Sequence, residues 1–414
     1  MSKNSKRKML YISMCMPFSK AFHAGGKTFH YYINSFAEDE NNEVILIAKV
    51  LPEEEKYIET INPKIKKYFV ATPKKGIAKY WCYVKSLNSK YSPYYKYGNV
   101  LTKEIYDQIE KKLEILQKKG YRPDVVILEW TSMLLFIERV KKYFPEAKYV
   151  ASEHDVSFLG YLRKYENANG VLNRKLKQVA YENLKKHELH AISQCDLVVT
   201  HNHKDKKLLL ENGVDPEKTD VIVPYYDRFP ATKRNPNKRD IIYYGAMNRV
   251  ENSLSAIWFI ENVLPKLTDC DVRFVIIGNK PPKELVQLES ERVKVTGFVE
   301  DPSTYFEQAM CLAAPLVLGA GIKVKIIEAL SSGVPVLTND IGIEGIDAED
   351  GKEYFHCTEP EEYENIIRQL ISEKIDSSVI TLNAKKMIEE KYDLKKSFEN
   401  YSNRIYHLAD NKGK

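Results

Sequence analysis

The feature that most constrains the fold is an alternation of short apolar runs, rich in β-branched residues, with longer amphipathic stretches. This alternation is typical of parallel strands joined by crossover helices, because a parallel strand can be reached only through a long connection. The runs lie at 9–16, 43–50, 66–72, 124–130, 147–154 and 195–202 in the first half, and at 219–226, 240–247, 272–278, 293–299, 310–317 and 335–340 in the second. The sequence therefore predicts an α/β protein, with a long helical region at about 160–192.

The pattern restarts after the polar, proline-containing stretch YYDRFPATKRNPNKRD at 225–240. Such a stretch suits a linker or the opening loop of a new domain. A chain of 414 residues with 43% hydrophobic content can bury two ordinary cores. We therefore predict two doubly wound, Rossmann-like domains with a cleft between them, spanning residues 1–222 and 223–390, followed by a C-terminal helix at 391–414.

The charge balance and the cysteines narrow the classes of function. The chain has 63 basic and 57 acidic residues and a formal charge of +6, which does not indicate a nucleic-acid partner. Its six cysteines are scattered singly, without the spacing of a zinc site. No apolar run approaches the roughly 20 residues needed to span a bilayer. We expect a cytoplasmic protein that can contact the inner face of the cell membrane peripherally.

The stretch PLVLGAGIKVKIIEALSSGVPVLTND, at 315–340, has the pattern of an anion site. Gly319 and Gly321 leave the backbone bare before a helix, so amide N–H groups at its start can face a phosphate. Lys323 and Lys325 are unfavourable for the helix dipole in this place unless an anion is bound. Glu328 lies one turn further, where a carboxylate can accept from the two hydroxyls of a ribose. The alternative is an ordinary glycine turn with a solvated Lys/Glu pair.

Four segments extend this pattern in order along the chain: IIYYGAMNRVENSLSAIWFIENVLP, VRFVIIGNKPP, VKVTGFVEDPSTYFEQAMCLAAPL and GAGIKVKIIEALSSGVPVLTNDIGIEGI. Together they resemble the glycosyl transferases group 1 family, the retaining, family 4-like glycosyltransferases of GT-B fold. The resemblance covers residues 241 to about 346. Several linked motifs are far more specific than one glycine-rich loop.

The resemblance implies a GT-B fold, in which an acceptor-side domain faces a donor-binding domain and the last helix crosses back onto the first. It also implies a metal-independent, hexosyltransferase-type enzyme that retains the anomeric configuration. No cofactor is expected, because the nucleotide-diphosphate sugar is a co-substrate. The acceptor would be a glycan, a lipid-linked sugar or a protein, in the synthesis of a surface polysaccharide or glycoconjugate.

The resemblance also assigns residues to the donor site. Glu328 matches the ribose ligand, and Lys325 supports the charge that grows on the leaving diphosphate. The residues expected to bind the donor in this half of the chain are Arg249, Asn252, Gly297, Phe298, Gly321, Ile322, Lys323, Lys325 and Glu328.

Two departures weaken the match. Ala320 replaces the first of the two glutamates that the family has eight positions apart, and Ala246 and Asn252 stand where many relatives have an arginine and a lysine. These departures leave open a non-catalytic GT-B subunit or glycan-binding partner of another glycosyltransferase. A non-hydrolysing nucleotide-sugar epimerase is a further alternative, disfavoured by the match at 319–345.

Two places in the first half of the chain match the family by position. Gly25 and Gly26, in FHAGGKTFHYY, follow the first strand, where the backbone can approach a phosphate or sugar. His154 and Asp155 follow a later strand, and His154 is the candidate for contact with the transferred sugar. The alternatives are a simple strand-to-helix turn and a loop histidine held by its neighbour. We predict the catalytic residues to be His154, Lys325 and Glu328.

The acceptor is less well predicted. The Lys- and Tyr-rich stretch at 73–120 suits anionic lipid headgroups or a carbohydrate, but equally a solvated helix pair with core tyrosines.

Overall fold

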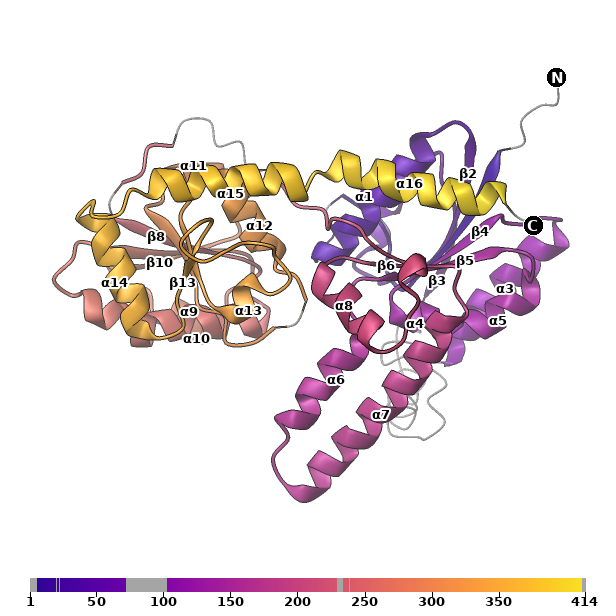
Figure 1. Cartoon of the computed structure of the whole chain (residues 1–414), viewed down its shortest axis with the longest axis horizontal. Helices are drawn as coiled ribbons and strands as arrows, with labels where there is room; N and C mark the ends of the chain where they lie inside the picture. The colour runs from indigo at the N-terminus through magenta and orange to yellow at the C-terminus, as the bar shows by residue number, and fades with distance from the viewer. Residues whose placement is uncertain are drawn as a thin grey trace. The chain divides into compact units, whose positions relative to one another are not determined.

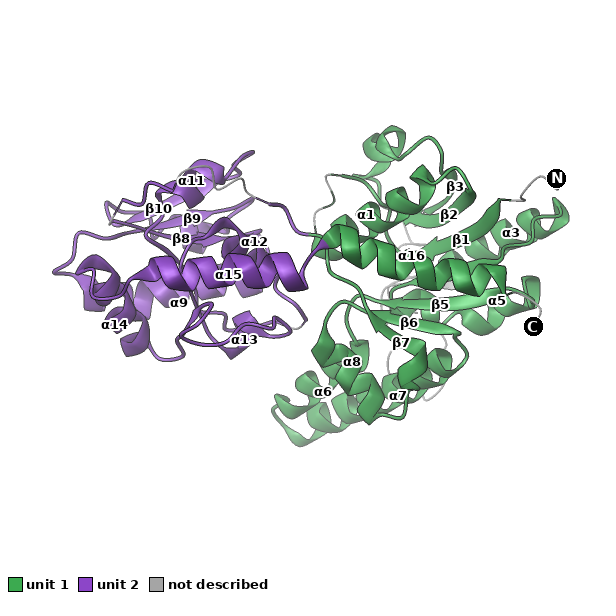
Figure 2. Cartoon of the chain, turned by 45° about the horizontal axis from the view of Figure 1, so that its top comes forward, with its two compact units in different colours: residues 1–225, 394–414 green, residues 226–393 purple. Residues whose placement is uncertain are grey.

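The structure is a computed structural model that describes residues 6–19, 21, 23–71, 103–228, 234–237, 239–319 and 321–411. The chain divides into two compact units (Figure 2). Unit 1 comprises residues 1–225 and 394–414, and unit 2 comprises residues 226–393. The boundaries predicted from sequence, after residues 222 and 390, lie three residues before these. Ala320 and residues 72–102, which include most of the Lys- and Tyr-rich stretch, lie outside the described residues.

The described part of unit 1 contains a parallel sheet in the order β3-β2-β1-β4-β5-β6-β7. Its strands are β1 (Arg7–Ser13), β2 (Asn42–Val50), β3 (Lys66–Ala71), β4 (Val125–Glu129), β5 (Lys148–Glu153), β6 (Leu197–Thr200) and β7 (Thr219–Val221). Alternate side chains of each strand enter different cores: Met9 and Tyr11 pack on one face, and Leu10 and Ile12 on the other.

Helices cover both faces of this sheet (Figure 1). The α-helices of unit 1 are α1 (Ala24–Glu38), α3 (Lys103–Lys118), α4 (Thr131–Leu134), α5 (Ile137–Tyr143), α6 (Ser157–Glu166), α7 (Val171–Ser193), α8 (His203–Glu211) and α16 (Leu394–Asp410). The described part of unit 1 also has the short 3-10 helices η1 (Glu55–Thr60) and η2 (Pro216–Lys218). α1 and α16 share the core of Met9 and Tyr11, whereas α3 and α5 pack against the face of Leu10. α16 is therefore part of unit 1, although it follows unit 2 in the chain.

Two details differ from the sequence prediction. The helical region predicted at 160–192 is two helices, α6 and α7, separated by a turn at 167–170. Asn167 is the C-cap residue of α6, and Gly170 is the N-cap residue of α7 with a φ of 81°, a positive value that glycine adopts at low cost. The run at 219–226, assigned to the second half, supplies β7, which pairs with β6 in unit 1.

Unit 2 has a second parallel sheet, in the order β10-β9-β8-β11-β12-β13 within the described residues. Its strands are β8 (Asp240–Tyr244), β9 (Arg273–Ile277), β10 (Val293–Gly297), β11 (Cys311–Ala314), β12 (Val336–Thr338) and β13 (Phe355–His356). Its helices are α9 (Val250–Asn262), η3 (Leu264–Leu267), α10 (Lys283–Val286), α11 (Ser303–Gln308), α12 (Val324–Ser332), α13 (Asp340–Ile343), α14 (Pro360–Ile371) and α15 (Ser377–Lys391). The two-residue strand β13 is too short to give a periodic signal in the sequence.

The strand order reverses at one point in each sheet, between β1 and β4 in unit 1 and between β8 and β11 in unit 2. Open parallel sheets bind ligands outside the carboxyl ends of the strands that flank such a switch point. The loops after β8 and β11 are therefore where a ligand of unit 2 is expected. No helix within the described ranges combines the length and the apolar composition needed to cross a bilayer.

Candidate functional site

Glycines line the carboxyl edge of the sheet in unit 2. Gly245 follows β8, Gly278 follows β9, and Gly319 and Gly321 lie in the loop between β11 and α12. The loops after β8 and β9 touch through their backbones, since a Cβ on Gly278 would lie only 1.6 Å from the carbonyl oxygen of Gly245. This close approach requires glycine at 278 and leaves backbone, rather than side chains, at the edge.

Lys325 lies at this edge in the first turn of α12. Its Nζ donates hydrogen bonds to Oδ1 of Asn252 at 2.7 Å and to the hydroxyl oxygen of Tyr243 at 2.9 Å. The same ammonium lies 4.6 Å from the centre of the Tyr243 ring, within cation–π range. Asn252 comes from the first turn of α9 and Tyr243 from β8, so the two sides of the switch point meet at Lys325. The structure thus brings together two residues that the sequence placed in the donor site.

The charge of Lys325 is poorly stabilised in this structure. Burial, together with the positive charges of Lys323 and Arg249, lowers the pKa of Lys325 to about 7. Its two hydrogen-bond acceptors are neutral groups, an amide oxygen and a phenol. The carboxylates of Glu251 and Glu328 offset this lowering only in part, and a bound anion would raise the pKa further.

The other predicted basic residues have carboxylate partners. Lys323, the N-cap residue of α12, lies 3.6 Å from Glu344 and also donates to the carbonyl of Gly321. Arg249, the N-cap residue of α9, pairs with Glu251 in an exposed ion pair. Arg249 is close enough to contribute to the lowered pKa of Lys325.

Glu328 is buried one turn along α12, and its Oε1 accepts from the backbone N–H of Asp227 at 3.2 Å. Asp227 lies in the segment that enters unit 2, so Glu328 also ties that segment to α12. Ile322 stands between Gly321 and the N-cap residue Lys323. Gly297 and Phe298 lie at the end of β10, separated from β8 by β9, and Phe298 is largely exposed.

A second group of polar residues lies at the carboxyl ends of β4, β5 and β6 in unit 1. His154, which follows β5, bonds through Nε2 to Oε2 of Glu129 at 2.9 Å, and the two side chains are only 8% and 6% exposed. Its ring stacks on Trp130 at 4.0 Å and on His201 at 4.4 Å, between ring centres. These four residues, Glu129, Trp130, His154 and His201, form what we call the histidine cluster.

The histidine cluster is electrically neutral at its centre. Burial raises the pKa of Glu129 to about 8 and lowers the pKa of His154 to about 3. Between these two pKa values, a protonated carboxyl of Glu129 can donate to Nε2 of a neutral imidazole. Among the residues that the structure describes, neither ring nitrogen of His201 has a hydrogen-bond partner, and burial and His154 hold its pKa well below the usual range.

The two predicted glycines of unit 1 lie next to this cluster at the start of α1. A Cβ on Gly25 would lie 3.1 Å from Nδ1 of His154, so glycine allows the helix to approach the imidazole closely. The N–H of Gly26 donates to Nδ1 of His23, which caps α1. Gly25 thus fits α1 to the histidine cluster, whereas Gly26 faces Ala21 and His23.

Comparison with known proteins identifies the second half of the chain. Residues 238–373 match the model of the family Glycosyl transferases group 1. The match contains the whole Lys325, Asn252 and Tyr243 network.

Solved glycosyltransferase structures share the fold of this chain over almost its whole length. HepE of Anabaena, in complex with UDP, is 15% identical, with a TM-score of 0.65 over 97% of this chain and 100% of that one. Sucrose-phosphate synthase of Thermosynechococcus elongatus is 13% identical, with a TM-score of 0.67 over 97% and 99%. The predicted GT-B fold class is therefore confirmed.

A curated relative is also similar in sequence. An uncharacterized 44.6 kDa protein in the cps region of Klebsiella pneumoniae is 24% identical over 197 residues. That alignment spans 44% of this chain and 49% of the relative.

Sequence reasoning missed several residues of the two candidate sites. Tyr243 and Glu344 were not singled out, and neither were Glu129 and His201. The last two end or follow predicted strands, at the edge where parallel sheets place ligand-facing residues, so strand position alone could have indicated them. The carboxyl group bonded to His154 is that of Glu129, and not that of its sequence neighbour Asp155.

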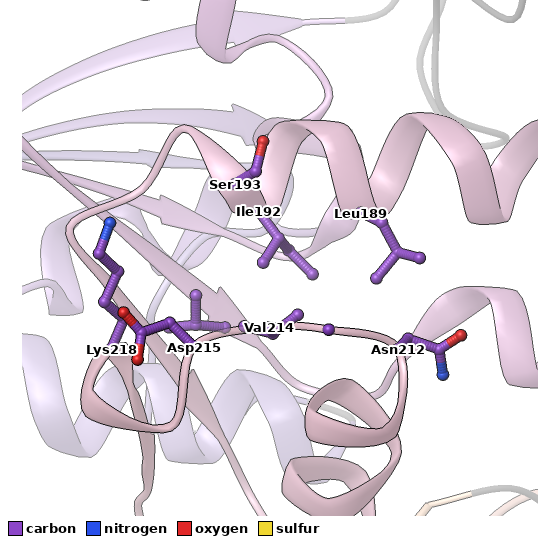
Figure 3. Close-up of a pocket in the computed structure, with 9 residues that line it drawn as sticks. Leu189, Ile192, Ser193, Asn212, Val214, Asp215 and Lys218 are labelled. Atoms are coloured by element: carbon purple, nitrogen blue, oxygen red, sulfur yellow. The ribbon is translucent and has the colours of Figure 1, made fainter.

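Unit 1 also contains a pocket of about 280 Å³, between the end of α7 and the loop after α8 (Figure 3). Leu189 and Ile192 line it on one side, and Val214, Asp215 and Lys218 on the other. These segments meet at the amino end of β6, opposite the carboxyl edge. We therefore assign this pocket no part in donor binding.

Proposed function

We propose that the protein is a retaining, metal-independent glycosyltransferase that uses a nucleotide-diphosphate sugar. The observation that carries this proposal is the Lys325, Asn252 and Tyr243 network, a lysine with a lowered pKa and neutral partners beside a glycine-lined helix N-terminus. A pyrophosphate is an anion that fits this edge by charge and by backbone approach. The family match over residues 238–373 supports the same function.

In the proposed mechanism, unit 2 holds the leaving nucleoside diphosphate. Glu328 accepts hydrogen bonds from the ribose hydroxyls. Lys325 and the backbone amides near Gly321 and Ile322 stabilise the negative charge that grows on the diphosphate as the glycosidic bond breaks. Lys323 and Arg249 add positive potential. His154 in unit 1 is our candidate for contacting the transferred sugar.

We propose a uridine nucleotide as the first donor to test, because HepE has been solved with UDP and also with UDP-glucose. The acceptor is a glycan, a lipid-linked sugar or a protein. A role in surface polysaccharide or glycoconjugate synthesis is supported by the relative in the cps region.

The first experiment is a thermal-shift titration with UDP, GDP, ADP and dTDP. A ligand that binds only the native state raises the unfolding temperature by mass action. We expect stabilisation by UDP that is lost in Lys325→Met and Glu328→Gln and kept in Lys352→Met, which changes an exposed lysine of the same unit. The anomeric configuration of the product, followed by NMR, then tests retention.

The alternative is a non-catalytic GT-B subunit that binds a glycan or another glycosyltransferase. The replacement of the family's first glutamate by Ala320 favours it. If none of the four nucleotides stabilises the protein, the alternative replaces our proposal.

A further inference from the structure

α6 and α7 form a helical hairpin, residues 157–193, that extends away from the sheet of unit 1 (Figure 1). We call it the α6–α7 hairpin. Its inner face is packed, because Ala180 and Leu184 of α7 share a core with Phe158 and Tyr161 of α6. This packing holds the hairpin together without covering its far end.

The far end of the α6–α7 hairpin presents apolar side chains to solvent. Val171 and Leu172, at the start of α7, are 90% and 74% exposed, and Leu176 is also exposed. Leu172 and Leu176 are four residues apart and therefore lie on the same face of the helix. Three large apolar side chains so close together at a protruding end indicate a binding surface rather than scattered exposure.

The charge of the α6–α7 hairpin indicates the kind of partner that binds its apolar far end. Residues 157–193 contain seven Lys and Arg residues and three Glu residues, so the hairpin has a net charge of +4 in a chain whose formal charge is +6. Arg174 and Lys175 lie between Leu172 and Leu176, and both are exposed. The cations thus surround the apolar residues at the far end.

We infer that the far end of the α6–α7 hairpin docks on a phospholipid bilayer with anionic headgroups. Val171, Leu172 and Leu176 enter the boundary between headgroups and acyl chains, while Arg174, Lys175 and Lys177 pair with the lipid phosphates. A second copy of the chain fits less well, because it would bring two hairpins of net charge +4 together. A soluble polyanion would satisfy the cations but not the apolar side chains.

The test is co-sedimentation of the full chain with vesicles, without donor or acceptor, so that its outcome is independent of the proposed enzymatic function. We expect binding to vesicles of phosphatidylcholine with added phosphatidylglycerol, weaker binding at high salt, and little binding to phosphatidylcholine alone. Val171→Asp/Leu172→Asp should weaken binding by about tenfold or more, because apolar burial is lost. Arg174→Glu/Lys175→Glu should weaken it on anionic vesicles only.

The matched control is Val379→Asp/Leu382→Asp, which changes two exposed apolar residues of α15 in unit 2, 56% and 67% exposed. This control should bind vesicles as the unchanged protein does. Absence of binding to anionic vesicles, or an equal loss in the control, would overturn the inference. So would light scattering that shows dimers dispersed by Val171→Asp/Leu172→Asp, which would assign the surface to a second copy.

Discussion

At the scale of single residues, the two candidate sites contain ionisable groups held away from their ordinary charge. Lys325 in unit 2 and Glu129 and His154 in unit 1 all have pKa values shifted by burial towards the neutral form. A protein retains such groups at a cost in stability, and they cluster at functional sites. Each shift therefore predicts a pH dependence that a substitution can remove.

The pKa of Lys325 predicts that nucleotide binding takes up a proton. Because the free protein has a pKa of about 7 at Lys325, a bound diphosphate must raise it. The affinity for UDP should thus fall by up to roughly tenfold per pH unit above pH 7. Calorimetry in buffers of different ionisation enthalpy measures the proton taken up.

Lys325→Met should bind UDP about 10- to 100-fold more weakly, because a charge-assisted contact is lost. Its affinity should also be nearly independent of pH above 7. A variant that keeps the full pH dependence would place the titrating group elsewhere.

The pKa of Glu129 predicts how stability varies with pH. Its pKa is raised from near 4.5 to about 8 in the folded protein, so between these values the folded state holds a proton that the unfolded state has lost. The contribution of this proton to the stability of the folded protein is complete below about pH 4.5 and is lost as pH rises through 8. Between pH 4.5 and 8, the titration of Glu129 should lower the free energy of unfolding by up to about 1.4 kcal/mol per pH unit. Glu129→Gln should lack this contribution, so its free energy of unfolding, measured by urea titration, should fall less over the same pH range.

Glu129→Gln should also keep activity at neutral pH, since its amide can still donate to Nε2 of His154. Glu129→Leu cannot donate and should lower kcat while leaving UDP affinity unchanged. Equal activity in both variants would give the histidine cluster a purely structural role, as would full activity in His154→Ala.

At the scale of elements, the loops that follow the strands decide the shape of the donor edge. β8 and β9 are ordinary buried strands, and their apolar runs are plain in the sequence. The contact between the loops after them, at Gly245 and Gly278, depends on the backbone path alone. No pattern in the sequence predicts this contact between the two loops.

Gly278→Ala should therefore destabilise unit 2 strongly. The added Cβ would lie 1.6 Å from a carbonyl oxygen, and a backbone atom cannot give way as a flexible side chain can. We expect a loss of about 3 kcal/mol or more in the free energy of unfolding. Gly351→Ala, at a positive φ but with no atom nearby, should cost only about 1 kcal/mol. If urea unfolding gave similar losses of unfolding free energy for Gly278→Ala and Gly351→Ala, backbone conformation, and not the close contact, would explain the need for glycine at 278.

At the scale of the whole molecule, the chain returns to unit 1 after completing unit 2. α16 packs on α1, where Tyr401 contacts the rings of Tyr32 and Phe36 at 5.8 and 5.5 Å between centres. The hydroxyl of Ser397 accepts from the backbone N–H of Val223 and bonds to the hydroxyl of Tyr32. Unit 1 is thus built from both ends of the chain.

Tyr401→Ala should destabilise unit 1 by about 3 to 5 kcal/mol, the usual loss for a large buried ring. Hydrogen exchange should rise in peptides of α1 and stay unchanged in peptides of α12, and UDP affinity should not change. Asn403→Ala, at an exposed position of the same helix, is the control and should have an effect within about 0.5 kcal/mol. Equal exchange changes in α12 would mean that the two units unfold together.

The sequence by itself determined the α/β class, the two-domain organisation, and the glycine-rich helix start with Lys323, Lys325 and Glu328. These features are local, since strand and helix periodicity, turn residues and helix termini are encoded within a few neighbouring positions. The match of residues 238–373 to the glycosyl transferases group 1 model was likewise predictable, because its motifs follow one another along the chain.

Only the tertiary structure decided which distant residues meet. Tyr243 reaches Lys325 across 82 positions, and Glu129 reaches His154 across 25. These pairings depend on the order of the strands in each sheet. The burial that comes with them shifts the pKa values of Lys325, Glu129 and His154. The turn at 167–170 divides the predicted helical region into the two helices of the α6–α7 hairpin, and this division is likewise seen only in the structure. Contacts and burial are properties of the packed chain, so no single stretch of sequence contains them.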